Sequence, residues 1–91
     1  MIYLLKCERF LKVGYTKSFE SRLQAIRAAV PFLVEVLMTR GGTLEEEQEF
    51  HQAHKDYLAG YGGREWYVDA PEFRRDAEEF LRLPVADVDL D

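Results

Sequence analysis

The chain has 91 residues, 47% of them hydrophobic and 13% aromatic, and its net charge at pH 7 is −5. This length allows one domain with one core, and a single cysteine excludes an internal disulfide. No apolar run approaches the ~18 residues of a membrane span. The N-terminal MIYLL also lacks the preceding basic segment of a signal peptide, so we expect a cytoplasmic protein away from the membrane.

The charge is unevenly distributed along the chain. Residues 1–42 contain seven basic and three acidic side chains, whereas residues 43–91 contain five basic and fourteen acidic ones. One basic face is enough to attract a polyanion, so the negative net charge does not exclude DNA as a partner.

The first half of the chain predicts two strands, a helix and a third strand. Residues 1–6 and 10–15 are short β-rich segments joined by the three residues CER, which is typical of a β-hairpin. Residues 18–29 begin with a serine suited to an N-cap and have apolar side chains at helical spacing. A proline ends this helix, and the segment FLVEVLM at 32–38 favours a strand.

The second half predicts a longer helix, a loop and a short strand. Thr43 and Glu46 have the spacing of a capping box, which predicts a helix over residues 43–59. The glycine-rich segment GYGGR at 60–64 then predicts a loop, and residues 66–68 are a strand candidate.

A last helix is expected from Asp69, which would cap it together with Glu72, to about Arg82. Residues 1–83 would then form one domain, and the acidic residues 84–91 a frayed tail. The order ββαβαβα indicates a small α/β (α+β) fold that begins with a β-hairpin.

Lys12 raises the first question about function. Leu11, Val13 and Tyr15 alternate along the second strand as half-buried residues do, which leaves Lys12 on the other face, and Gly14 interrupts the strand. A strand lysine usually extends its ammonium into water. From the strand alone, that interpretation stays open beside a functional one.

Glu47 raises the second question. A helical projection places its side chain in the apolar stripe that Phe50, His54 and Leu58 define. A carboxylate that faces a core is costly unless it meets a cation, a metal ion or several donors. A structural pair with a nearby arginine or histidine is therefore one explanation, and a metal site is the other.

Four side chains from different elements could line one concave site. Arg22 projects from the edge of the first helix's apolar stripe, and the hairpin contributes Tyr3 and Lys12. With Glu47 they provide cations that bind a phosphodiester and a carboxylate that holds a divalent metal. The alternative is that these side chains do not meet.

Other residues give weaker signals. His51 and His54 lie three positions apart on one helix, but no third or fourth ligand has suitable spacing for a structural zinc site. Trp66 is more typical of a core position than of a base-stacking platform. Cys7 has no neighbour that would make it a nucleophile.

Several short segments together resemble the GIY-YIG endonuclease superfamily, and in particular its phage and bacterial branch. In chain order they are IYLL at 2–5, KVGYT at 12–16, Arg22 within FESRL, EQEFH at 47–51 and REWY at 64–67. No single segment is specific. The ordered set, which spans most of the chain, carries the resemblance.

The resemblance implies a three-stranded, mixed antiparallel sheet flanked by helices, and hydrolysis of DNA with one Mg²⁺ or Mn²⁺ ion. By position, Tyr3 would help to place the attacking water, Lys12 would act as or beside the general base, and Arg22 would bind the scissile phosphate. Glu47 would be the sole protein ligand of the metal. The expected substrate contacts are Gly14, which lets a phosphate approach the backbone, and Tyr15, Lys17 and His51.

Two positions depart from the family pattern. Met1 replaces the glycine of the first motif, and Lys12 replaces the tyrosine that usually begins the second. Lys12 would act as a base only after losing its proton near neutral pH. Otherwise it would stay charged and stabilise the transition state.

The leading expectation is thus a metal-dependent DNA endonuclease. The alternative is a non-catalytic module of the same fold that binds nucleic acid or protein, which the acidic second half favours. In either case a homodimer or a protein partner would supply specificity. A third option is that the acidic last helix is a docking site.

Overall fold

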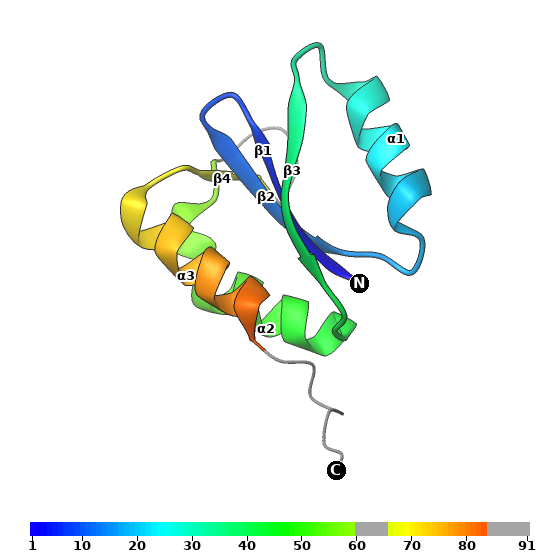
Figure 1. The fold of residues 1–91 in the computed structure, drawn as a ribbon. Helices are drawn as coiled ribbons and strands as arrows, with labels where there is room; N and C mark the ends of the chain where they lie inside the picture. Colours follow the sequence, from blue (N-terminus) through cyan, green and yellow to red (C-terminus); the bar gives the residue numbers. More distant parts are fainter. Residues whose placement is uncertain (60–65, 84–91) are drawn as a thin grey trace.

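A four-stranded antiparallel sheet forms the centre of the molecule (Figure 1). The computed structural model describes residues 1–59 and 66–83, so the predicted loop at 60–64 and the predicted tail at 84–91 lie outside the described residues. The strands follow the order β3-β1-β2-β4 across the sheet, with β1 at Ile2–Cys7, β2 at Phe10–Tyr15, β3 at Val34–Arg40 and β4 at Trp66–Val68.

The predicted fold class is confirmed, but the expected strand count and the mixed sheet are wrong. Trp66–Val68 pairs with Phe10–Lys12 and adds a fourth strand beside β2, and all three strand pairs are antiparallel. A three-residue strand gives almost no periodic signal, so its place in the sheet follows from pairing with a distant segment.

The hairpin turn is tighter than the three predicted residues. Cys7 pairs with Phe10, which leaves only Glu8 and Arg9 between the strands. Glu8 has a φ of 57°, the left-handed conformation that two-residue hairpin turns require at their first central position. The Lys6 ammonium donates a hydrogen bond of 2.8 Å to the Glu8 carbonyl oxygen and supports this turn.

The sheet separates α1 from the other two α-helices, as Figure 1 shows. α1 (Phe19–Ala29) covers one face, and α2 (Leu44–Ala53) and α3 (Pro71–Arg82) cover the other. None of the helices in the described part of the chain is long and apolar enough to cross a membrane.

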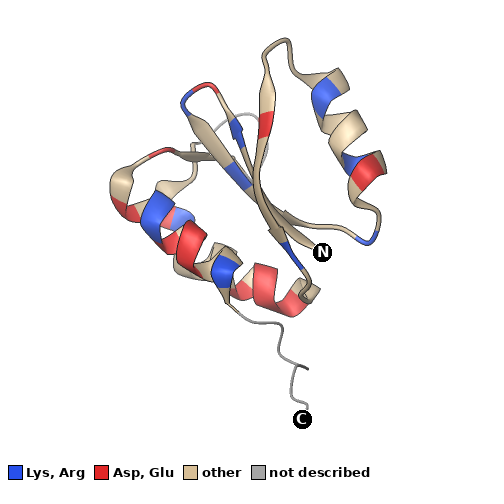
Figure 2. Ribbon diagram, in the orientation of Figure 1, with Lys and Arg blue, Asp and Glu red and all other residues tan. Residues whose placement is uncertain are grey.

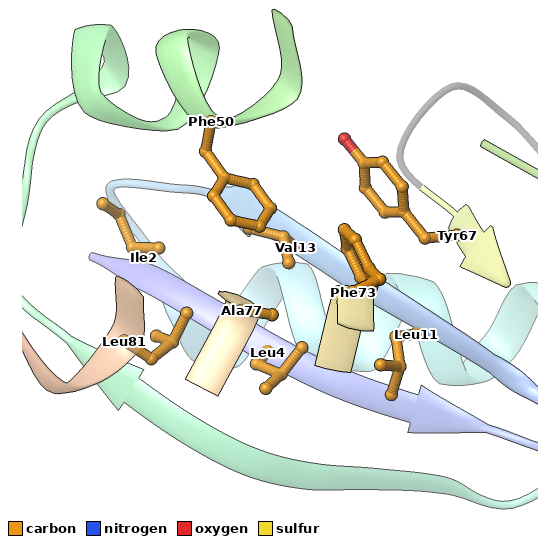
Figure 3. Close-up of a cluster of buried hydrophobic side chains, with 9 residues drawn as sticks. All are labelled: Ile2, Leu4, Leu11, Val13, Phe50, Tyr67, Phe73, Ala77 and Leu81. Carbon is orange, nitrogen blue, oxygen red and sulfur yellow. The ribbon is translucent and has the colours of Figure 1, made fainter. Parts of the chain in front are cut away.

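The main core lies between the sheet and the α2–α3 pair (Figure 3). Alternate residues of β1 and β2 point toward it, and aromatic rings from α2, β4 and α3 complete it. Phe73 is fully buried and stacks on Tyr67, with ring centroids 4.3 Å apart. The buried members are Ile2, Leu4, Leu11, Val13, Phe50, Tyr67, Phe73, Ala77 and Leu81. Each large member contributes about 1.5–3 kcal/mol by its burial.

The opposite face of the sheet is less densely covered. Its buried residues are Tyr3, Leu5, Cys7 and Val34, which alternate with those of the main core. The predicted apolar stripe of α1 does face this cluster, but Phe19, Leu23 and Ile26 are only partly buried, and α1 has no fully buried residue. This helix therefore packs only loosely against the sheet.

The predicted capping box is confirmed at the start of α2. The Thr43 side chain accepts a hydrogen bond from the Glu46 N–H, and the Glu46 carboxylate accepts one from the Thr43 N–H. The helix ends at Ala53 rather than at residue 59, because His54 leaves the helical conformation with φ −122° and ψ 20°. A short 3₁₀ turn, η1 (Lys55–Tyr57), continues the chain.

The predicted cap of α3 is wrong. Ala70 is the N-cap residue, its side chain makes no capping bond, and Pro71 begins the helix with a φ already suited to it. Asp69 instead pairs with Lys6 at 3.0 Å and with Arg74 at 3.2 Å. The carboxylate that the sequence suggested as a cap therefore ties α3 to the first strand.

Candidate functional site

Lys12 lies in the interior of the sheet and not at its edge. It pairs with Leu5 of β1 on one side and with Trp66 of β4 on the other. Only 9% of the residue is exposed, and its ammonium lies over the Trp66 ring, 5.0 Å from the centroid. The interpretation of Lys12 as a lysine that extends into bulk water does not hold.

Tyr3 and Gly14 are cross-strand partners on the same face as Lys12. Tyr3 is fully buried, and its ring tilts against Phe19 of α1 at a centroid distance of 5.7 Å. A Cβ atom on Gly14 would lie inside the van der Waals surface of the Tyr3 phenol. The space that Gly14 leaves is thus filled by this ring, and the expected approach of a phosphate to Gly14 stays a prediction.

Arg22 and Lys12 line the same cavity. This cavity, of about 730 Å³, lies between α1 and the sheet near the hairpin turn. Arg22 is exposed on α1, and its guanidinium has no ion pair with any residue that the structure describes. Two of the four predicted catalytic residues, which lie on separate elements, are therefore brought to one cavity.

Glu47 is buried on α2, as the helical projection predicts, with 5% of the residue exposed. Its Oε2 atom lies 2.6 Å from Nε2 of His51, one turn later on the same helix. The same Nε2 atom lies 2.9 Å from the carbonyl oxygen of Val13 in β2. The paired strand β4 begins at Trp66, opposite Lys12, and the imidazole contacts β2 at the next residue, Val13.

The contacts of His51 define which nitrogen holds its proton. A backbone carbonyl oxygen can only accept, so Nε2–H donates to Val13 and faces the Glu47 carboxylate. In the neutral ring, Nδ1 then accepts a hydrogen bond from the Tyr67 hydroxyl. Tyr67 and Val13 together fix the ring that holds Glu47. Sequence reasoning missed Tyr67, although its alternation with Trp66 and Val68 in β4 marks it as the inward residue of that strand.

The four predicted catalytic residues do not line one concave surface. Glu47 borders a second hollow of about 500 Å³ beside α2, which it shares with Gln48, His51, Gln52 and Lys55. The two hollows lie on opposite faces of the sheet, because Lys12 and Gly14 face α1, whereas His51 reaches the intervening Val13 from α2. The arrangement is thus two cations on one face of the sheet and an acid held beside β2 from the other.

The remaining expected substrate residues differ in their surroundings. Tyr15 packs against the main core on the opposite face from Lys12, and Lys17 is exposed in the segment between β2 and α1. His51 contacts Glu47, Val13 and Tyr67 and also borders the hollow beside α2, so its expected contact with substrate stays a prediction. Its geometry is that of a positioning residue for the carboxylate.

His54 is a structural histidine, as expected. Its ring stacks on Phe50 at 4.1 Å, Nδ1 donates to the Phe50 carbonyl oxygen, and Nε2 lies 3.1 Å from the Asp76 carboxylate of α3. These contacts join α2 to α3 and direct His54 away from His51.

Arg40 is a buried cation that sequence reasoning missed. Only 8% of it is exposed, at the end of β3. Its guanidinium donates to the carbonyl oxygens of Phe80 and Gly41 and to the Glu46 carboxylate, and lies over the Phe80 ring. Arg40 therefore joins β3, α2 and α3.

A divalent metal ion would have one protein ligand at this site. Within residues 1–59 and 66–83, no group of three or more His, Cys, Asp or Glu side chains is arranged to hold a metal. Magnesium commonly keeps several waters and takes one or two carboxylates together with substrate phosphates. The anchored Glu47 carboxylate, which borders an open hollow, fits that mode of binding.

Comparisons of the chain with models of protein families, with curated proteins and with solved structures give no match. The motif order described above and the geometry of these side chains are therefore what supports a function.

Proposed function

We propose that this chain is a metal-dependent DNA endonuclease of the GIY-YIG type. The observation that carries the proposal is Glu47, a buried acid held by a histidine that contacts β2. Lys12, also of β2, lines a cavity on the other face of the sheet with the exposed Arg22. Cations that bind a phosphodiester and a fixed carboxylate that holds a metal ion are the groups that its hydrolysis uses.

In this proposal Arg22 and Lys12 bind the phosphodiester and neutralise the charge that builds up on it. Arg22 has the planar fork that matches two phosphate oxygens, and Lys12 provides a point charge fixed by Trp66. Glu47 would hold a Mg²⁺ or Mn²⁺ ion, which would activate water and stabilise the leaving group. His51 keeps the carboxylate in place, and Tyr3 shapes the floor of the site at Gly14.

One specific observation favours the alternative, a non-catalytic module that binds nucleic acid or protein. The contact of Glu47 with His51 satisfies a buried carboxylate without any metal. Figure 2 also shows that the charged residues of α2 are acidic, whereas α1 and α3 carry basic residues as well. DNA binding would in either case depend on few phosphate contacts, so it should be weak and be reduced further by salt.

Plasmid nicking in Mg²⁺ or Mn²⁺ tests the proposal. Glu47→Gln keeps the side-chain shape and removes the charge, so we expect a loss of cutting of roughly 10²–10³-fold, and a similar loss for Arg22→Ala. Glu45→Gln is the matched control, because it makes the same change on the exposed side of α2 and should cut like the wild type. Circular dichroism establishes that each variant is folded.

DNA binding without cutting, in either metal and with the wild-type protein, would contradict the proposal and support the binding module. Wild-type activity in Glu47→Gln would contradict it as well. Nuclease activity that remains in both Glu47→Gln and Arg22→Ala would indicate a contaminant.

A docking role of α3, the last helix, cannot be tested by removing the helix. Phe73, Ala77 and Leu81 of α3 are buried in the main core, so truncation after Tyr67 would remove part of that core. Substitution of the exposed Glu72 and Glu79 by Gln leaves the core intact. Loss of a protein partner in that variant would support docking.

A further inference from the structure

The cavity between α1 and the sheet is larger than a phosphate-binding site requires. A phosphate is held by a few cations and N–H groups, whereas about 730 Å³ is the size of a pocket for a small organic ligand, roughly 300–1,000 Å³. The walls away from the two cations are mainly apolar, from the following residues: Phe10, Ala25, Ile26, Ala29, Val30 and Trp66.

The cavity exists because of the residues on one face of α1. Arg22, Ala25 and Ala29 follow one another at helical spacing and all border the cavity. Alanine is too short to reach the sheet, so this side of the helix leaves a gap, while Phe19 and Leu23 make the contact to the sheet. An apolar gap open to water is an unfavourable surface, and a flat apolar ligand would cover it.

The charges around the cavity indicate the chemistry of that ligand. Lys12 approaches from β2 and Arg22 from α1, and Glu8 at the hairpin turn is the single acid among the lining residues that the structure describes. The Lys12 ammonium lies directly over the indole of Trp66. An occupant with an anionic group for the cations and an aromatic ring for the indole is a nucleotide.

We infer that this cavity binds an unpaired nucleobase whose own backbone phosphate lies at Lys12 and Arg22. The inference rests on the proposed function and narrows its substrate to single-stranded DNA, or to duplex DNA with an extruded base. A base inside a duplex is already stacked and paired, and taking it out costs free energy that a single strand does not require. The chain should therefore prefer DNA with unpaired bases.

Trp66 is the only tryptophan of the chain and lies on the cavity wall, so its fluorescence reports an occupant directly. The measurement is made in EDTA, without cutting. We expect a short single strand to quench Trp66 and to bind about tenfold more tightly than the same sequence as a fully paired hairpin. An abasic strand of equal charge should bind more weakly and leave Trp66 fluorescence unchanged.

A matched pair of variants locates the effect in the cavity. Ala29→Phe places a ring in the gap, whereas Ala28→Phe makes the same change at the neighbouring residue, which does not border the cavity. Both positions are exposed, so both variants should fold. We expect Ala29→Phe to bind single strands about tenfold more weakly and to lose the preference over the hairpin, and Ala28→Phe to bind as the wild type does.

The inference is overturned if Ala29→Phe and Ala28→Phe bind the single strand equally. Equal quenching by the abasic strand would overturn it as well, since the cations alone would then explain binding. If saturating DNA leaves Trp66 unchanged, the cavity has another occupant, such as an apolar peptide, and the inference fails too.

Failure of the proposed function gives a different result. Suppose that the single strand quenches Trp66 in the wild type and not in Ala29→Phe, but that neither metal ion supports cutting. The inference of a base pocket is then supported, and the proposal of a nuclease is contradicted. If the wild type and Ala29→Phe cut single strands and paired DNA alike, the nuclease stands and the pocket fails.

Discussion

The two faces of the sheet are built differently. Toward α2 and α3, side chains from every neighbouring element interlock, and Phe73 is fully buried between the other aromatic rings. Toward α1, the sheet presents a smaller cluster, and the helix that covers it has no buried residue. The cavity and both candidate phosphate-binding cations lie on this second face.

The comparison shows how a small chain can combine stability with an open site. One densely packed face provides most of the apolar burial, so the other face can leave a gap beneath its helix. The network of Glu47, His51 and Tyr67 belongs to the dense side, because Tyr67 is part of the main core and its hydroxyl bonds the histidine that holds the acid.

The largest effect should come from the dense face. Phe73→Ala removes a fully buried ring and should lower the free energy of unfolding by about 3–5 kcal/mol. Leu23→Ala, on the partly buried face of α1, should cost clearly less. Urea denaturation of both variants measures the difference, with Phe73→Leu as a milder substitute if Phe73→Ala does not fold. Equal losses of unfolding free energy at Phe73 and Leu23 would show that the two faces do not differ in packing.

A second test concerns the tightest contact of the open face. Gly14→Ala forces a methyl group into the Tyr3 ring and should cost about 1–3 kcal/mol. In a Tyr3→Leu background the same substitution should cost much less, because the ring is gone. A double-mutant cycle measures this coupling, and purely additive losses would show that Tyr3 is not the reason for the glycine.

The support of the buried acid can be weakened by removing a single oxygen atom. Tyr67→Phe keeps the ring in the core but leaves Nδ1 of His51 without the hydroxyl that it bonds. We expect a loss of about 1–2 kcal/mol in stability. If the proposed nuclease is correct, cutting should fall roughly 10–100-fold with DNA affinity unchanged, because the anchor of the metal ligand is disturbed. Unaltered cutting would remove Tyr67 from the site.

A smaller effect is expected at the start of α2, the helix that bears Glu47. Thr43→Ala removes the side-chain acceptor of the capping box and should cost about 1 kcal/mol. Thr43→Ser, which keeps the acceptor, should be close to the wild type. Thermal denaturation of the two variants tests whether the cap contributes; indistinguishable curves would mean that it does not.

The smallest expected effect is a dependence on pH at Cys7. Burial raises the pKa of the Cys7 thiol, and the neighbouring Glu8 carboxylate raises it further. The unfolded chain then loses this proton at a lower pH than the folded chain, so stability should fall as the pH rises above the ordinary thiol pKa of about 8.5. Cys7→Ala should show a flatter alkaline decline, and identical slopes would contradict the assignment.

Local pattern was sufficient for much of this architecture. The hairpin, α1 and the capping box of α2 follow from residues that are close in sequence, and the inward position of Glu47 follows from helical spacing alone. Each of these depends on neighbours within one or two turns of the chain. Sequence reasoning therefore predicted the buried acid, and a nearby histidine was one of the partners that it offered.

The features that the sequence did not predict depend on contacts between distant segments. Residues 66–68 are predicted as a strand, but their place beside β2 as a fourth strand depends on pairing with a distant segment. Asp69 turns from the helix cap to Lys6, which lies far away in sequence. The bond from Tyr67 to His51 and the burial of Arg40 have the same origin. The gap under α1 depends on the distance between this helix and the sheet, and the periodicity of residues along the sequence does not determine that distance.

The main core also joins the beginning and the end of the described chain. Ile2 and Leu4 of the first strand belong to the same cluster as Ala77 and Leu81 of the last helix. During synthesis β1, one of the two inner strands, leaves the ribosome before α3, so this part of the core cannot form until residue 82 has emerged. A chaperone dependence that ends when α3 leaves the exit tunnel would be the cellular sign of this topology.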